Sequence, residues 1–208
     1  MNKRDNRIYE PKEIDKLDLK KYGLTHLEGR NILTLDGTDI DRLLEALGND
    51  DVSLNVPLPC TPQVIQELLS ISECRRCGGC CVPNPLNPES PGVEVFRDEL
   101  RSIAANLNTS YETMEKETSI GKVVSYPFDM TKLSITRWLP LPCPFHDAEP
   151  DNCRVYTERP VVCKIHPVIF TGDPESLAIK VNCDYGKEIL IGAYKWVHER
   201  EPDLEILL

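Results

Sequence analysis

Four of the chain's nine cysteines lie within eight residues, in the run Cys74-Arg-Arg-Cys77-Gly-Gly-Cys80-Cys81. Thiols this dense are typical of a metal site, and the two glycines let the backbone fold tightly around an ion. The odd number of cysteines also prevents complete pairing in disulfides. The run therefore predicts a metal centre, and a fold in which loops come together around thiolates.

Four later cysteines complete the set of candidate ligands, and each has a proline or an asparagine nearby that favours a turn: Cys143, Cys153, Cys163 and Cys183. The adjacent Cys80 and Cys81 raise a separate question, because neighbouring side chains point in different directions in most backbone conformations. We therefore expect either two centres or one centre with a spare reactive thiol.

Three further residues could be confused with ligands. Cys60 lies apart from the motif, between Pro59 and Thr61, and is expected to be a bystander thiol. His146 and His166 each follow a candidate ligand by three residues and could bind metal. With eight thiols available, we expect them to have supporting or surface roles.

The spacing of Cys74, Cys77 and Cys80 is the C-x2-C-x2-C spacing of bacterial ferredoxins, but zinc also takes four thiolates from such paired cysteines. Ligation by thiolates alone suits both metals. An ordinary zinc site rarely needs eight thiols, although two zinc ions with four ligands each would account for the number. We expect an iron–sulfur cluster, 4Fe-4S in type, with zinc as the alternative.

The combined cysteine pattern resembles that of the CxxCxxCC family, described as zinc- or iron-chelating proteins. The matching motifs are Cys74-x2-Cys77-Gly-x-Cys80-Cys81, Cys143-Pro-Phe and Cys153-Arg-Val-Tyr156-x2-Arg159-Pro160-x2-Cys163-x3-Pro167. The resemblance covers about residues 70 to 185 and implies ligand roles for the matching cysteines. One branch of the family is linked to lysine methylation of flagellin, but this chain is much shorter than such a methylase.

Charge and hydropathy restrict the partners and the compartment. Acidic residues outnumber basic ones by 34 to 24, so the net charge of −10 argues against nucleic acid as a primary partner. The charged start is not followed by the apolar stretch of a signal peptide, and no apolar run is long enough to cross a bilayer. We expect a cytoplasmic protein without direct membrane insertion. A place on the cytosolic face of a membrane complex is compatible with this sequence.

The remaining pattern predicts an α+β fold: a small cysteine-rich metal-binding domain with several helices, a short antiparallel sheet and long proline-rich loops, plus an N-terminal extension. The expected division is an extension with one helix at 1–58 and a cysteine-cluster domain with a C-terminal helix at 59–208. A helix capped by Thr38 or Asp39 should end at Gly48, and a second should start at Thr61-Pro62.

Further elements follow from periodicity and turn residues. Helices are expected at 93–107, with Val95, Leu100, Ile103 and Leu107 in the core, at 109–118 with Thr109 as the cap, and at 185–199. Strands are expected at 121–128 and 132–139, joined by Asp129-Met-Thr131, and at 168–170 and 177–181. Proline-rich loops should cover 82–88 and 140–167.

No catalytic template accompanies the cysteines: the chain has no dinucleotide or phosphate-binding glycine motif, no His-Glu-x-x-His and no Gly-x-Ser-x-Gly. We therefore favour a non-enzymatic iron–sulfur protein whose centre responds to oxygen or redox state and regulates binding to a partner protein or metabolic complex. The alternatives are a structural zinc protein used for interaction, and an enzyme or accessory subunit such as a protein methyltransferase.

Overall fold

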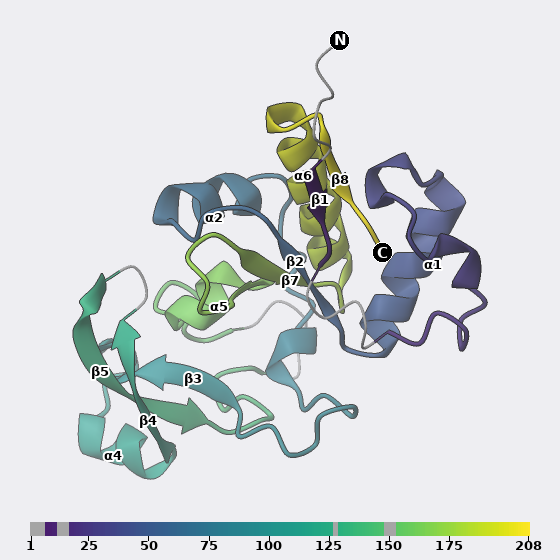
Figure 1. Cartoon of the computed structure of the whole chain (residues 1–208). Coiled ribbons are helices and arrows are strands. Elements are labelled where there is room, and N and C mark those ends of the chain that lie inside the picture. Colours follow the sequence, from purple (N-terminus) through teal and green to yellow (C-terminus); the bar gives the residue numbers. More distant parts are fainter. Residues whose placement is uncertain (1–6, 12–16, 127–128, 148–152) are drawn as a thin grey trace. The chain divides into compact units, whose positions relative to one another are not determined.

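The computed structural model describes residues 7–11, 17–126, 129–147 and 153–208 (Figure 1). It confirms the predicted α+β class, with helices and antiparallel sheets. The chain forms two compact units. We call Met1–Glu73 with Pro167–Leu208 the terminal unit, and Cys74–His166 the cysteine unit. These units do not coincide with the expected division after residue 58, because the two ends of the chain pair with each other.

The terminal unit contains two small sheets. The antiparallel sheet has the order β2 (Ser53–Val56), β7 (Leu177–Lys180), β6 (Val168–Phe170). The parallel pair consists of β1 (Arg7–Tyr9) and β8 (Leu204–Ile206). Strands β6 and β7 confirm the two expected strands, whereas β8 was not expected. Each sheet joins an N-terminal strand to a C-terminal one, and the expected boundary after residue 58 stays a prediction.

Helix α1 (Gly37–Asn49) confirms the first predicted helix, but both of its ends differ from expectation. The N-cap is Asp36, whose side chain accepts a hydrogen bond from the Asp39 N–H at 2.9 Å. Gly48 lies inside the last turn. A Cβ there would lie 3.0 Å from the Val181 carbonyl oxygen, so this glycine allows close packing instead of ending the helix.

Helix α2 (Pro62–Leu69) begins as predicted, because the Thr61 hydroxyl accepts an N–H of the first turn at 3.2 Å. The long helix α6 (Asp184–Arg200) packs against β2 and β7. Two tyrosines of α6 attach it to its neighbours: Tyr185 donates to the Leu69 carbonyl at 3.2 Å, and the buried Tyr194 donates to the Asn55 carbonyl at 3.0 Å.

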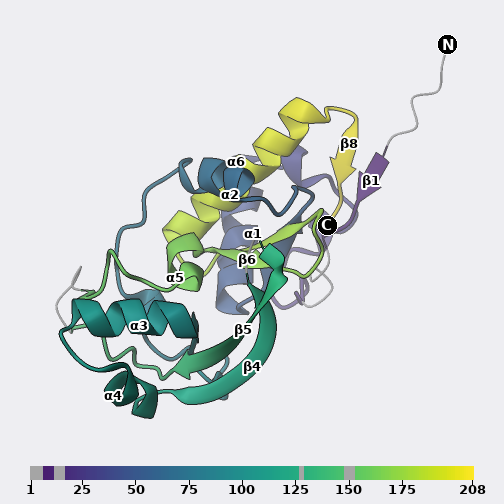
Figure 2. The same ribbon diagram turned by 90° about the vertical axis from the view of Figure 1, so that its left-hand side faces the viewer.

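The cysteine unit is built on an antiparallel sheet with the order β3 (Val93–Phe96), β5 (Asp129–Leu139), β4 (Ser119–Tyr126). Figure 2 shows β4 and β5 as a long, curved pair with α3 (Arg97–Asn106) and α4 (Tyr111–Lys116) nearby. The predicted hairpin is confirmed. Its expected connection, 129–131, is instead the start of β5, and residues 127–128 lie outside the described part of the chain.

Two helix starts in this unit correct the sequence prediction. Residues 93–96 form strand β3 rather than the first turn of a helix, because the backbone pairs with β5, with Val93 opposite Leu139. The helix begins only at Arg97. The shorter helix α4 is capped by Ser110, not Thr109, and the Ser110 hydroxyl accepts the Thr113 N–H at 3.2 Å.

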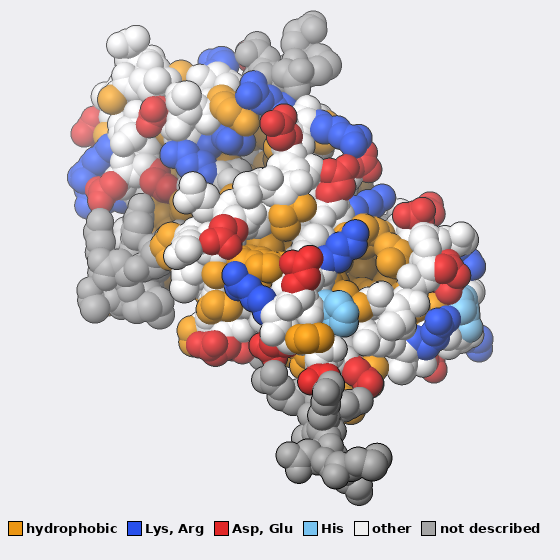
Figure 3. Space-filling view, turned by 90° about the horizontal axis from the view of Figure 1, so that it is seen from above, with side chains coloured by type: hydrophobic (Ala, Val, Ile, Leu, Met, Phe, Trp, Pro, Cys, Tyr) orange, Lys and Arg blue, Asp and Glu red, His pale blue; other side chains and the backbone are white. Residues whose placement is uncertain are grey.

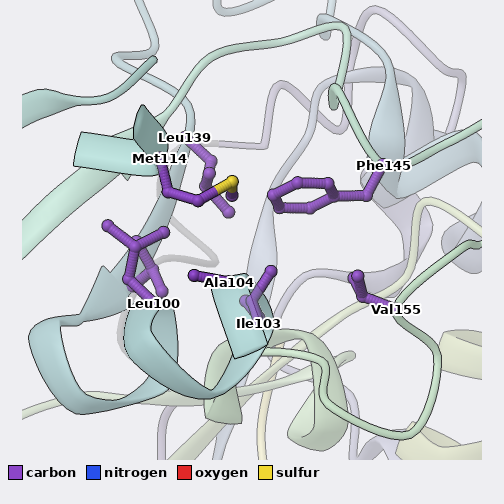
Figure 4. Packing of buried hydrophobic residues seen from close by; sticks show 8 residues of the cluster. Leu100, Ile103, Ala104, Met114, Leu139, Phe145 and Val155 are labelled. Atoms are coloured by element: carbon purple, nitrogen blue, oxygen red, sulfur yellow. The ribbon is translucent and has the colours of Figure 1, made fainter. Parts of the chain in front are cut away.

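A hydrophobic cluster holds the cysteine unit together (Figure 4). Its buried residues come from β3, α3, α4, β5 and two loops: Val95, Leu100, Ile103, Ala104, Met114, Leu139, Phe145 and Val155. Three predicted core residues are thus confirmed, and the fourth, Leu107, is partly buried against the cluster. Phe145 and Val155 each lie two residues after a candidate ligand, so they attach the cysteine-bearing loops to the core.

The described residues include no helix that is long and apolar enough to span a membrane. On the face of the molecule in Figure 3, acidic and basic side chains are interspersed.

Candidate metal centre

The first cysteine loop is a tight turn shaped by two residues with left-handed backbone. Arg76 has φ +52° and Gly78 has φ +73°. The Arg76 N–H donates to Cys74 Sγ at 3.4 Å, and the Cys81 N–H donates to the Gly78 carbonyl at 2.8 Å. Three thiol-bearing residues of the loop are exposed: Cys74, Cys77 and Cys80. The loop therefore turns back on Cys74 Sγ and carries three exposed cysteine residues, although burial also acts on the thiol of Cys80.

Backbone hydrogen bonds join this loop to the next two cysteines. The Cys143 N–H donates to the Cys81 carbonyl at 2.7 Å. His146 and Cys153 form an isolated antiparallel bridge, supported by the Arg154 N–H donating to the Phe145 carbonyl at 2.9 Å. Three cysteine-bearing segments that are distant in sequence thus lie beside one another.

Within this group the Cys81 thiol lies within hydrogen-bonding reach of the Cys80 and Cys143 sulfurs. Hydrogen bonding from Cys81 is the main cause that lowers the pKa of Cys143 to about 6 and that of Cys80 to about 7. Backbone N–H groups of Phe145 and His146 also favour the Cys143 thiolate. The pKa of Cys81 itself is raised, because its proton is held between the two acceptors. Since the thiolate is the form that binds metals, Cys80 and Cys143 are prepared for ligation.

Cys163 lies on the five-residue helix α5 (Val161–Ile165). Burial, and then the charges of Cys80 and Cys143, raise the pKa of the Cys163 thiol to about 12. The start of α5 is held by Glu99 on α3, whose Oε1 accepts the Val161 N–H at 2.7 Å. Sequence reasoning missed this role of Glu99, and no local pattern signals it, because the two residues are 62 positions apart.

Two arginines lie against one aromatic ring of the motif. The guanidinium carbons of Arg76 and Arg159 lie 4.0 and 3.7 Å from the centroid of Tyr156. The Arg159 Nε also donates to the Tyr156 carbonyl at 2.9 Å, and the positive charge of Arg159 helps to lower the pKa of Cys80. This stack connects the first cysteine loop to the last one and places positive charge beside thiols.

The other two cysteines lie in the terminal unit. Cys183 caps α6, where its Sγ accepts the Gly186 N–H at 3.4 Å. Its predicted ligand role stays a prediction. Cys60 is half-buried, its N–H donates to the Pro174 carbonyl at 2.7 Å, and burial raises its pKa. These contacts are compatible with the bystander role expected for Cys60.

The donor set of the cysteine unit suits a thiophilic metal. It comprises seven thiols, two of them favoured as thiolates, and one buried imidazole nitrogen, His146 Nε2, with no hydrogen-bond partner among the described residues. In the described part of the chain, no three Cys, His, Asp or Glu side chains already surround a common point as ligands of one ion. The cysteines are instead held in hydrogen-bonded neighbourhoods.

A comparison with known proteins agrees with this donor set. No curated protein and no solved structure matches the chain. The sequence model of the CxxCxxCC family, described as "Putative zinc- or iron-chelating domain", matches residues 73–184, which is more than half of the chain. The matched segment contains all eight candidate ligands and leaves Cys60 outside. The chain belongs to the CxxCxxCC family of metal-chelating domains.

Proposed function

We propose that the protein carries an iron–sulfur cluster, has no enzymatic activity of its own, and uses the oxidation state or presence of the cluster to regulate binding to a partner protein or complex. The observation that carries the proposal is the solvent exposure of Cys74, Cys77 and Cys80, which have the spacing of a ferredoxin run. Oxidants and oxygen reach exposed thiolates more readily than buried ones. A centre held there is therefore suited to sensing.

Charges and hydrogen bonds around the thiols are compatible with an iron–sulfur centre. The potential of such clusters is tuned by hydrogen bonds to sulfur and by solvent exposure. The Arg76 N–H bonded to Cys74 Sγ is one such hydrogen bond, and the Arg159 charge beside Cys80 would stabilise an anionic centre rich in thiolates. When bound, the cluster supplies a one-electron redox centre, and the polypeptide supplies its accessibility and its electrostatic surroundings.

The loop after Cys81 offers a surface for the partner. Val82 and Leu86 are 46% and 57% exposed, and their apolar side chains follow the cysteine run directly. Because ligand binding and local folding are coupled, loss of the centre would free the thiolates and the loop that they hold. The same residues would then present a different surface. We propose that this loop binds the partner in one state and releases it in the other.

The test uses the full chain, purified without oxygen and mixed with anoxic cell extract before and after exposure to air. The expected result is a partner captured in only one condition, and lost in the Val82→Ser, Leu86→Ser double variant while the metal content stays unchanged. Ile120→Ser is a matched control, because Ile120 is 77% exposed on β4 of the same unit. Identical partners in both conditions would contradict the switch.

A further inference from the structure

His146 has a buried imidazole nitrogen, Nε2, that the described part of the chain leaves without a hydrogen-bond partner. Leaving a buried polar atom unsatisfied costs about 1–3 kcal/mol, so native proteins nearly always provide such an atom with a partner. The missing partner of Nε2 needs an explanation.

The backbone holds this histidine between two candidate ligands. Its N–H donates to the Cys143 carbonyl at 3.1 Å, which closes a turn from one cysteine to the imidazole. On the other side, His146 bridges Cys153. Neighbouring Phe145 is buried in the hydrophobic cluster, which leaves His146 on the other side of the segment. Backbone contacts with both neighbouring cysteine residues therefore fix the position of the imidazole ring.

The imidazole lies directly over the first cysteine loop. A Cβ added to Gly78 would lie 2.7 Å from His146 Cε1 and closer still to Nε2, so only glycine at this position makes room for the ring. Gly78 itself is buried, although the residues on both sides of it are exposed. The next glycine faces Cys77, because a Cβ on Gly79 would lie 3.6 Å from Cys77 Sγ. The glycine pair thus brings a buried nitrogen and a thiol to the same short stretch of backbone.

We propose that His146 Nε2 is a ligand of the metal centre, alongside thiolates of the loop that contains Gly78. This inference rests on the proposed metal-binding function and gives it a mixed thiolate–imidazole ligand set. A neutral imidazole is a good ligand for both zinc and iron. Replacing thiolate by imidazole raises the potential of an iron–sulfur centre, so the same residue would also tune its response to oxidants.

This assignment differs from the supporting role expected from the sequence. The matched residue is His166, which follows Cys163 by three residues just as His146 follows Cys143. His166 lies at the end of helix α5 and is half-buried. The glycine clearance and the unpartnered nitrogen single out His146, and spacing alone could not distinguish the two histidines.

The test is X-ray absorption spectroscopy of the full chain loaded with zinc alone. The expected spectrum of the unmodified protein has a nitrogen shell at about 2.0–2.1 Å beside sulfur at about 2.3 Å. The nitrogen shell disappears or the metal is lost in His146→Gln, whereas His166→Gln leaves both shells unchanged. His146→Cys restores full metal content with sulfur ligands only.

A spectrum of the unmodified protein with sulfur ligands only would overturn the assignment of His146 while leaving the metal site intact. A nitrogen shell that disappears in His166→Gln but persists in His146→Gln would overturn it as well. Failure of the unmodified protein to bind either zinc or iron would overturn the proposed function together with this inference. A spectrum with sulfur ligands only decides against His146 without any variant, and where a nitrogen shell is present, His166→Gln and His146→Cys control for misfolding.

Discussion

The two units differ in what holds them together. Most of the largest fully buried side chains among the described residues lie in the terminal unit, for example Leu24, Leu54 and Ile189. The cysteine unit has a smaller apolar cluster and contains seven of the nine cysteines. A small core often needs a metal to complete its stability. We infer that the cysteine unit depends on its metal and that the terminal unit does not.

Removal of the metal should have the largest effect, and the effect should be confined to one unit. Structural zinc contributes roughly 10–16 kcal/mol of apparent binding free energy in small domains, and this energy stabilises the fold. We expect amide hydrogen exchange of residues 143–147 and 153–166 to accelerate by orders of magnitude after chelation. The amides of β2 and β7 should keep their protection. Equal acceleration in both units would contradict the comparison.

Core substitutions should separate stability from metal binding. Leu100 in the cysteine unit and Leu177 in the terminal unit are both 0% exposed. Either Leu→Ala change should cost about 2–5 kcal/mol of unfolding free energy. Only Leu100→Ala should also weaken metal binding, because Phe145 and Val155 attach the cysteine loops to the cluster that contains Leu100. Denaturant unfolding measures the loss of stability, and competitive metal titration measures the loss of metal affinity. A loss of metal affinity in Leu177→Ala would contradict the prediction that metal binding depends on the core of the cysteine unit alone.

Glu99 allows a finer test inside the cysteine unit. Its carboxylate accepts the Phe96 N–H at 2.9 Å and the Val161 N–H at 2.7 Å. Glu99→Gln replaces one acceptor oxygen by a donor, so it should cost about 1–3 kcal/mol and loosen α5, which carries Cys163. The exposed Glu45 on α1 is the control, and Glu45→Gln should change the unfolding free energy by about 0.5 kcal/mol or less. Equal losses of unfolding free energy in the two variants would contradict a role of Glu99 in positioning α5.

The pH dependence of thiol reactivity should distinguish the cysteines of the metal-free protein. With pKa values of about 6 and about 7, Cys143 and Cys80 should be alkylated near neutral pH, before Cys163 with its pKa of about 12. Mass spectrometry of labelled peptides across a pH series measures the order. Labelling of Cys163 before Cys143 would contradict the lowered pKa of Cys143 and its cause, the hydrogen bonding from Cys81.

The same titrations should make the stability of the metal-free chain depend on pH. A lowered thiol pKa favours the folded state above the ordinary thiol pKa, and this contribution is lost as the pH falls through about 7 for Cys80 and about 6 for Cys143. The raised pKa of Cys81 acts in the opposite sense: its contribution is present below the ordinary pKa and is lost as the pH rises. Below the ordinary thiol pKa, Cys81 stays protonated in both the folded and the unfolded chain. Denaturant unfolding of the metal-free chain should therefore show a stability that rises with pH from about 6 towards that value and falls above it.

Local patterns in the sequence predicted much of this structure. The cap and proline at Thr61-Pro62 set the start of α2, because the relevant contact spans one helical turn. The alternating residues of β4 and β5 likewise predicted the hairpin. The cysteine motifs identified the metal-binding family, whose sequence model matches residues 73–184.

Contacts between residues that are distant in the sequence could not be predicted from local patterns. Valine-rich residues 93–96 could belong to a helix or a strand, and only pairing with β5 decides between them. The parallel pairing of β1 with β8 joins opposite ends of the chain, and no turn residue signals it. In the candidate site, Glu99 and the clearance of Gly78 beneath His146 depend on segments that meet only after folding.

The most direct test of the account is metal and sulfide analysis of the full chain purified without oxygen. The account predicts a coloured protein with iron and acid-labile sulfide in equal amounts, both lost when Cys143 is changed to Ser and both retained when the bystander Cys60 is changed to Ser. Stoichiometric zinc in a colourless protein would contradict the iron–sulfur function. Absence of any bound metal would contradict the central claim that the cysteine unit is a metal centre.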